Sequence, residues 1–334
     1  METIQNEGSL PPLDPTLAPV LLFDYAGGAG GGEASDGRLL YSIPTRRSLL
    51  ARGARRFIDD VNWVTPQGWV LTLDPATRDA SLMDPFTSRK VSLPPDTDSI
   101  VAGSGSTRCF LSTPTPADEG CVVLAVHLTD PVLCYCHPGG SRWFRHEYRP
   151  EDVDADGAVG AMALLTGAGA GRFHTYLSTP TNKLATLELL PEPVLTTTRV
   201  VNRPCSTGCC YIKYWKLESC GELFMVRFCY SRLSDKRVSR VEVQRLDWST
   251  SAWVKVTELG VNRVFFVRWG QFGASMAADE LGLKGNCVYF TLNGDKGLYV
   301  YNMERGTTTL HNPGLDVPDS MEPLILMRVN PNMT

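Results

Sequence analysis

The sequence lacks a long hydrophobic run. Although 43% of its 334 residues are hydrophobic, no stretch approaches the roughly 18 apolar residues that a membrane-spanning helix needs. The first residues, Met1–Glu7, also lack the basic segment of a secretion signal and the arginines of a transit peptide. We therefore expect a cytoplasmic or nuclear protein with no membrane partner.

An excess of positive charge is also missing. The chain has 32 Lys and Arg residues against 36 Asp and Glu residues, a formal net charge of −4. Nucleic-acid-binding domains usually carry a broad basic surface, so no nucleic-acid partner is expected. In the second of two local basic groups, valines alternate with charges, which indicates a solvated strand edge rather than a phosphate-binding patch. The groups are Arg46, Arg47, Arg52, Arg55 and Arg56, and Arg232, Lys236, Arg237, Arg240 and Arg245.

The ten cysteines lack the spacing of a zinc site. Without a secretion signal, reduced thiols are expected rather than disulfides. One cluster is Cys134–His137, and the other contains Cys205, Cys209, Cys210 and Cys220; neither has paired C-x2-C knuckles. On a strand, Cys134 and Cys136 share one face, which fits two small buried hydrophobic residues as well as two ligands. We predict no metal or cofactor, and leave open whether the second cluster is more than free thiols.

Catalytic signatures are absent as well. The five histidines form no H-x-x-x-H motif, and Gly103–Ser106 lacks the G-x-S-x-G pattern of a nucleophile elbow. The glycines of Gly27–Gly32 are not followed by the Lys-Ser/Thr of a phosphate loop. The acidic pairs Asp59–Asp60 and Glu151–Asp152 are interpreted as solvated loop charges. The sequence therefore predicts no catalytic residue.

Short apolar or alternating runs, bounded by Gly, Pro, Asn and Asp, recur along the chain and predict strands. One exception is Ser275–Leu283, whose Ala, Met, Glu and Leu content predicts a short helical insertion. The predicted strands are Val20–Tyr25, Trp69–Leu73, Cys121–His127, Val132–Cys136, Phe173–Leu177, Leu184–Leu189, Glu222–Tyr230, Val238–Leu246, Val264–Trp269, Cys287–Leu292 and Leu298–Asn302.

Three segments repeat one pattern: strand, turn, a strand ending in Asp or Asn, turn, strand. They begin at Trp69, Phe224 and Cys287, and weaker copies span Gly120–Tyr148 and Ala161–Leu190. Such self-similarity predicts an all-β propeller of five to six blades, favoured over a pair of β-sandwiches. Asp74, Asp84 and Asp247 are expected to cap turns. Among the tryptophans, Trp69, Trp215, Trp248, Trp253 and Trp269 are expected to pack in blades, and Trp143, between arginines, to be exposed.

Two motif blocks resemble a known family. The first is Gly68–Leu71 followed by Leu82–Pro95, and the second is Trp253–Val256, Leu259–Gly260, Val264–Phe266, Gly285–Phe290 and Val300–Met303. Both resemble the signatures of a plant F-box-associated family of kelch-like β-propellers, although Asp84 stands where that signature usually has Asn. The resemblance covers roughly Leu10 to Pro313. It implies a propeller that binds proteins, since relatives bind a brassinosteroid-signalling protein kinase.

The family's helical F-box is not recognisable in Met1–Arg56, where Pro15 and Pro19 interrupt any helical pattern. We therefore expect a non-enzymatic interaction module that recognises a regulatory protein, such as a kinase, without Skp or cullin partners. The open alternatives are an enzyme with a site in the central channel, and a decoy that competes with F-box relatives for their targets. The expected organisation is a disordered segment 1–9, a propeller over 10–318 with a glycine-rich loop at 26–37, and a tail at 319–334.

Overall fold

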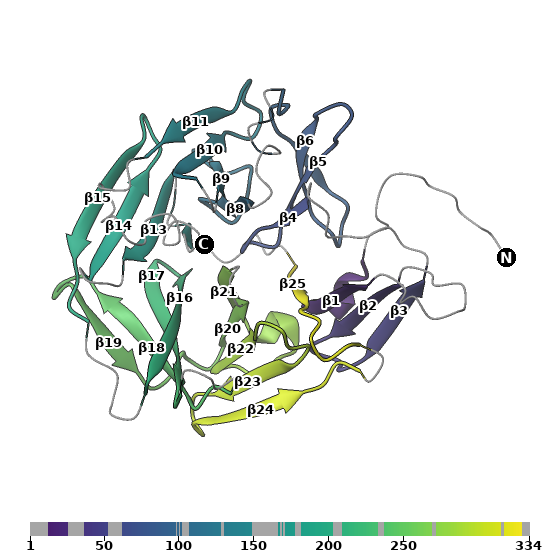
Figure 1. Cartoon of the computed structure of the whole chain (residues 1–334), viewed down its shortest axis with the longest axis vertical. Helices are drawn as coiled ribbons and strands as arrows, with labels where there is room; N and C mark the ends of the chain where they lie inside the picture. Colours follow the sequence, from purple (N-terminus) through teal and green to yellow (C-terminus); the bar gives the residue numbers. More distant parts are fainter. Residues whose placement is uncertain are drawn as a thin grey trace.

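The fold is a six-bladed β-propeller in a computed structural model (Figure 1). Its blades are antiparallel sheets arranged around a central axis, except for one parallel pair in the last. The all-β prediction is confirmed, and the predicted five to six blades resolve to six. The structure describes residues 13–25, 37–52, 62–97, 99, 101, 107–127, 130–148, 166–167, 169, 171–177, 182–202, 209–232, 237–268, 272–314 and 317–328.

The first three blades are numbered by their order along the chain, and their strands are given from the axis outward. Blade 1 contains β25 (Leu324–Leu326), β1 (Val20–Tyr25), β2 (Gly37–Ser42) and β3 (Ser48–Arg52). Blade 2 contains β4 (Asn62–Val64), β5 (Val70–Leu73), β6 (Ala80–Met83) and β7 (Lys90–Ser92). Blade 3 contains β8 (Thr107–Leu111), β9 (Val123–His127), β10 (Val132–Cys136) and β11 (Phe144–Glu147).

The last three blades follow the same outward order. Blade 4 contains β12 (Thr166–Gly167), β13 (Arg172–Leu177), β14 (Lys183–Glu188) and β15 (Val194–Arg199). Blade 5 contains β16 (Tyr211–Ser219), β17 (Glu222–Tyr230), β18 (Arg240–Asp247) and β19 (Ala252–Val256). Blade 6 has five strands: β21 (Phe272–Ala277), β20 (Arg263–Arg268), β22 (Cys287–Thr291), β23 (Leu298–Asn302) and β24 (Thr307–His311). Short 3-10 helices, η1 (Pro15–Leu17) and η3 (Asp279–Leu281), are the helices of the described residues, and neither is long and apolar enough to span a membrane.

The ring is closed by strands from opposite ends of the sequence. The yellow strand β25 lies beside the purple strand β1 in Figure 1 and pairs with it antiparallel, with Leu21 opposite Ile325. The sequence places 319–334 in a tail, and this boundary is wrong for β25. Its three residues are too few to stand out as a strand, but all of them are buried in blade 1.

Six hydrophobic clusters fill the spaces between neighbouring blades, one for each interface. Alternation along each strand supplies residues to the clusters on both of its sides. On β2, for example, Leu39 and Tyr41 face blade 6, whereas Leu40 faces blade 2. The core therefore consists of radial layers, and the strand ends are left to form the two faces of the disc.

A recurring five-residue turn explains the repeat seen in the sequence. In blades 2, 5 and 6 it begins with Asp84, Asp247 or Asn302, whose side-chain oxygen accepts from a backbone N–H two or three residues later. The fifth residue has positive φ, 58° at Ser88 and 63° at Gly306. Asp74 caps a similar turn between β5 and β6. The predicted role of Asp74, Asp84 and Asp247 as turn caps is confirmed.

The expected helical insertion at 275–283 is only partly helical. Residues up to Ala277 continue β21, which pairs with β20, and helix is confined to η3. Ala and Met favour a helix in isolation, but pairing inside a sheet overrides this preference. The expected disordered segment 1–9 lies outside the described residues, as does the glycine-rich loop 26–37 apart from Gly37.

Candidate functional site

A pocket of about 540 Å³ lies on the propeller axis at one face of the disc. Because neighbouring strands are antiparallel, the turns between the first and second strands of blades 2 to 5 lie on this face, as do the turns between the third and fourth strands of blades 1 to 5. In blade 6 the β23–β24 turn lies on the same face, because Asn302 at the end of β23 pairs with Cys287 at the start of β22. We call it the pocket face. Every blade contributes to the pocket, through residues that include Met327, Gln67, Ser112, Gly167, Ser219 and Ser275 from blades 1 to 6 in that order.

Blades 2 and 3 are joined at the pocket wall by side chains that form hydrogen bonds with the backbone of the neighbouring blade. The amide of Gln67 donates to the carbonyl of Leu111 at 3.0 Å and accepts from its N–H at 3.3 Å. The indole N–H of Trp69 donates to the carbonyl of Pro114 at 3.2 Å. A Cβ on Gly167, from blade 4, would lie 2.3 Å from the Leu111 carbonyl oxygen, so only glycine permits this approach of β12 to β8. The wall is therefore fixed in position.

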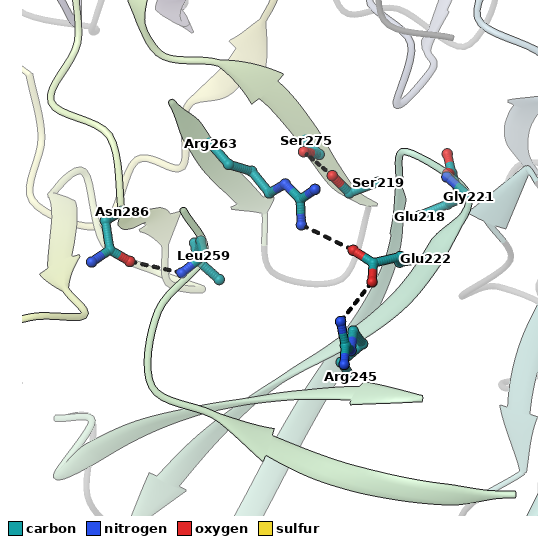
Figure 2. Close-up of polar contacts among 9 residues, drawn as sticks. All are labelled: Glu218, Ser219, Gly221, Glu222, Arg245, Leu259, Arg263, Ser275 and Asn286. Carbon is teal, nitrogen blue, oxygen red and sulfur yellow. Dashed lines mark hydrogen bonds and ion pairs between the residues drawn. The ribbon is translucent and has the colours of Figure 1, made fainter. Parts of the chain in front are cut away.

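Blades 5 and 6 are joined by a polar network beside the pocket (Figure 2). The Ser219 and Ser275 hydroxyls lie 2.8 Å apart. Glu222 accepts from Arg245 at 2.7 Å and from Arg263 at 3.4 Å, and so bridges the two blades. Glu218 accepts from the N–H of Gly221, and burial raises its pKa against the opposing effects of that bond and of Arg263. These contacts hold the β16–β17 turn at the pocket rim.

An exposed tryptophan stands at the pocket rim. Trp248 follows Asp247 in the β18–β19 turn and is 52% exposed. Its ring lies 5.6 Å from that of His174, whose Nδ1 is 3.0 Å from the hydroxyl of Thr186. Burial, with a smaller effect of Arg172, lowers the pKa of His174 to about 4. The imidazole is thus neutral at pH 7, and His174 and Trp248 together form an uncharged aromatic part of the rim.

We expect the His174→Gln variant to lose less stability than the wild type when the pH falls from 7 to 5. Between pH 6.5 and about 4 the unfolded chain binds a proton at His174 that the folded chain does not. The stability that the uncharged His174 contributes is therefore fully present above pH 6.5 and is lost as the pH falls toward 4. Urea unfolding at pH 7 and pH 5 measures this. Equal falls in midpoint for the two proteins would contradict the assignment.

The pocket does not bring together a nucleophile and a base in the described part of the chain. Ser219 is bonded to Ser275, and the described nitrogen contact of His174 is to Thr186. Cys220 is a free, exposed thiol. The described residues also contain no group of three or more His, Cys, Asp or Glu side chains placed to hold a metal ion.

The cysteine clusters take two different positions. Cys134 and Cys136 share one face of β10, as predicted, and are buried in the core between blades 2 and 3 with Cys109 and Cys121. Burial raises the pKa of Cys134 to about 12, so it stays a neutral thiol. Of the second cluster, Cys209, Cys210 and Cys220 form no disulfide within the described residues and are at least partly exposed, and Cys209 accepts a hydrogen bond from Arg240 at 3.2 Å. Cys205 lies outside the described residues.

Several other predictions fall outside the described residues: Asp59–Asp60, Glu151–Asp152, Gly27–Gly32, Arg55, Arg56, Lys236 and Trp269. The tryptophan assignment is wrong at two positions. Trp143 is buried and donates to the carbonyl of Pro94 at 2.8 Å, whereas Trp248 is exposed. The flanking arginines predict that Trp143 is exposed, but its indole packs between blades 2 and 3 and forms a hydrogen bond with Pro94. A tryptophan inside the polar turn Asp247–Ser251 is the signal that could have identified the rim.

Comparison with known proteins identifies a propeller family. A family model described as the KIB1-4 beta-propeller matches residues 40–302, well over half of the chain. No curated protein matches the chain. Among solved structures, a protein of unknown function from Bacteroides caccae is 11% identical, with 85% of this chain and 83% of that chain covered and a TM-score of 0.29. A structure titled "YCF48 bound to D1 peptide" is 13% identical, with 96% and 97% covered and a TM-score of 0.35. These TM-scores are too low to bear on function.

Proposed function

Since the chain belongs to the KIB1-4 beta-propeller family, we propose that it is a non-enzymatic interaction module that binds a protein partner on the pocket face. The observation that carries the proposal is the exposed Trp248 at the rim of a concave pocket. Aromatic side chains beside a preformed pocket are typical of the residues that dominate binding energy at protein interfaces. The rigid interblade contacts described above keep this surface preorganised.

The partner class is a regulatory protein, for which the motif resemblance suggests a protein kinase. At this part of the rim, the exposed ring of Trp248 beside an uncharged His174 favours an apolar or aromatic anchor from the partner. We further propose that recognition proceeds without Skp or cullin subunits, in the cytoplasm or nucleus. Residues of all six blades line the pocket, so a partner seated there contacts several blades of one scaffold.

Replacement of Trp248 by Ala is expected to weaken partner binding by about 30-fold or more, the effect of losing a hot spot of about 2 kcal/mol. The tagged protein is used to capture partners at physiological salt, and mass spectrometry identifies proteins that the wild type retains and the variant loses. The dissociation constant of the recovered partner is then measured for both proteins.

The matched control is Val254→Ala. Val254 is also apolar and exposed, at 39%, and belongs to blade 5, but lies on the outer strand β19. Its replacement should leave binding unchanged. Equal affinity of wild type and Trp248→Ala for the recovered partner would refute the proposed surface, and recovery of Skp and cullin subunits would refute the absence of a ligase scaffold.

A further inference from the structure

A second cavity, of about 390 Å³, opens between blades 1 and 6 and shares no lining residue with the axial pocket. It lies where the hydrophobic cluster shared by these blades ends, since Tyr41 and Tyr289 belong both to that cluster and to the lining of the cavity. We call the cavity the blade 1/6 cleft.

One wall of the cleft is the polar face of the outer strands of blade 6. Asn302 is opposite Thr307 in the pairing of β23 with β24, and Val300 is opposite Thr309. Such cross-strand pairs lie on the same side of the sheet, as does His311 two residues after Thr309. The wall therefore presents hydroxyl, amide and imidazole groups to whatever occupies the cleft.

Three cationic side chains also line the cleft, beside apolar residues such as Ile43, Leu283 and Leu298. Arg46 comes from the β2–β3 turn, Arg305 from the β23–β24 turn, and Lys284 follows η3. The described residues that line the cleft include no Asp or Glu. Neither arginine forms an ion pair within the described residues, and Lys284 lies 3.9 Å from Glu304 in an exposed pair of little energetic weight.

Arg46 lies close to the polar groups of the cleft. Burial raises the pKa of Tyr289 to about 12, and the positive charge of Arg46 opposes that rise. Burial, then Arg46, lowers the pKa of His311, and Tyr41 also feels the charge of Arg46. The Arg46 guanidinium therefore acts on two tyrosines and a histidine, and an anion placed beside it would have these groups as further hydrogen-bond partners.

We propose that the blade 1/6 cleft binds a phosphate group carried on a serine or threonine side chain of the protein partner, with Arg46, Arg305 and Lys284 as its cationic contacts. Guanidinium groups bind phosphate through paired, charge-assisted hydrogen bonds. The inference rests on the proposed function, because the turns that carry Arg46 and Arg305 lie on the pocket face. A partner seated at the axial pocket can therefore reach both sites.

The probe is a fluorescein-labelled peptide library with a fixed phosphoserine and random flanking positions, compared by anisotropy with the same library carrying serine. The wild type should bind the phosphorylated library at least about tenfold more tightly, the effect of one charge-assisted hydrogen bond of about 1.5 kcal/mol. Arg46→Gln and Arg305→Gln should each remove about this difference. Arg47→Gln is the matched control, because Arg47 is the exposed neighbour of Arg46 but does not line the cleft.

Equal losses in Arg46→Gln and Arg47→Gln would show non-specific attraction and overturn the proposal. So would binding of inorganic phosphate without binding of the phosphorylated library, because the phosphate would then not be carried by a peptide. The experiments distinguish failure of the cleft proposal from failure of the pocket proposal. Trp248-dependent capture of a partner, with no preference for the phosphorylated library, refutes the cleft alone, and the opposite result refutes the pocket alone.

Discussion

A chain that ends at Pro323 is expected to lose its cooperative unfolding transition, because it lacks the strand that closes the ring. Truncation removes Leu324, Ile325, Leu326 and Met327, all at most 4% exposed. Burial of each such side chain contributes about 1.5–3 kcal/mol. Their combined loss is comparable with the total stability of a typical domain, about 5–15 kcal/mol. Near-ultraviolet circular dichroism during thermal unfolding measures the effect.

The cooperative transition should be lost because the ring is no longer closed, and not because the chain is shorter. Without β25, strand β1 becomes the inner edge of blade 1, with unpaired backbone groups facing the axis. A chain that ends at Arg328 retains β25 and is the control; it should unfold like the full chain. If the chain ending at Pro323 had the same transition midpoint as this control, β25 would not close the propeller.

Strands buried on both faces are among those predicted most clearly from the sequence. Val132–Cys136 and Glu222–Tyr230 have the predicted bounds, and their residues are almost all buried. Propeller blades pack on both sides, so their middle strands form continuous apolar runs that are easy to recognise. Outer strands such as Val194–Arg199 expose most of their residues and carry no apolar pattern. Repetition of the turn chemistry reveals the blades even where single strands are missed.

The candidate site could not be predicted in the same way, because it is assembled from all six blades. His174 on strand β13 of blade 4 meets Trp248 in a turn of blade 5, and no local motif links them. Gln67 reads as an ordinary polar turn residue until its side chain is found bonded to Leu111 of the next blade. The basic residue Arg46 belongs to a group visible in the sequence, but the cleft around it requires blade 6, whose strands lie more than 200 residues away.

Tryptophans bond reciprocally across the interface of blades 2 and 3. Trp69 of blade 2 donates to the carbonyl of Pro114 in blade 3, and Trp143 of blade 3 donates to the carbonyl of Pro94, which follows β7. Both side chains belong to the same hydrophobic cluster. Each indole therefore combines packing within the interface with one hydrogen bond to the neighbouring blade.

Replacement of Trp69 by Ala is expected to lower the free energy of unfolding by about 3–5 kcal/mol, the usual result of truncating a buried aromatic residue. Trp69→Phe retains much of the ring packing and should lower the free energy of unfolding by less. It also leaves the Pro114 carbonyl without its hydrogen-bond donor. Urea unfolding of both variants separates packing from hydrogen bonding.

Trp69 is 1% exposed and adjoins the pocket wall, so Trp69→Ala should also weaken partner binding. Trp248→Ala, in contrast, should weaken binding with little change in stability. Equal stability of wild type and Trp69→Ala would contradict the role of this interface in holding the wall.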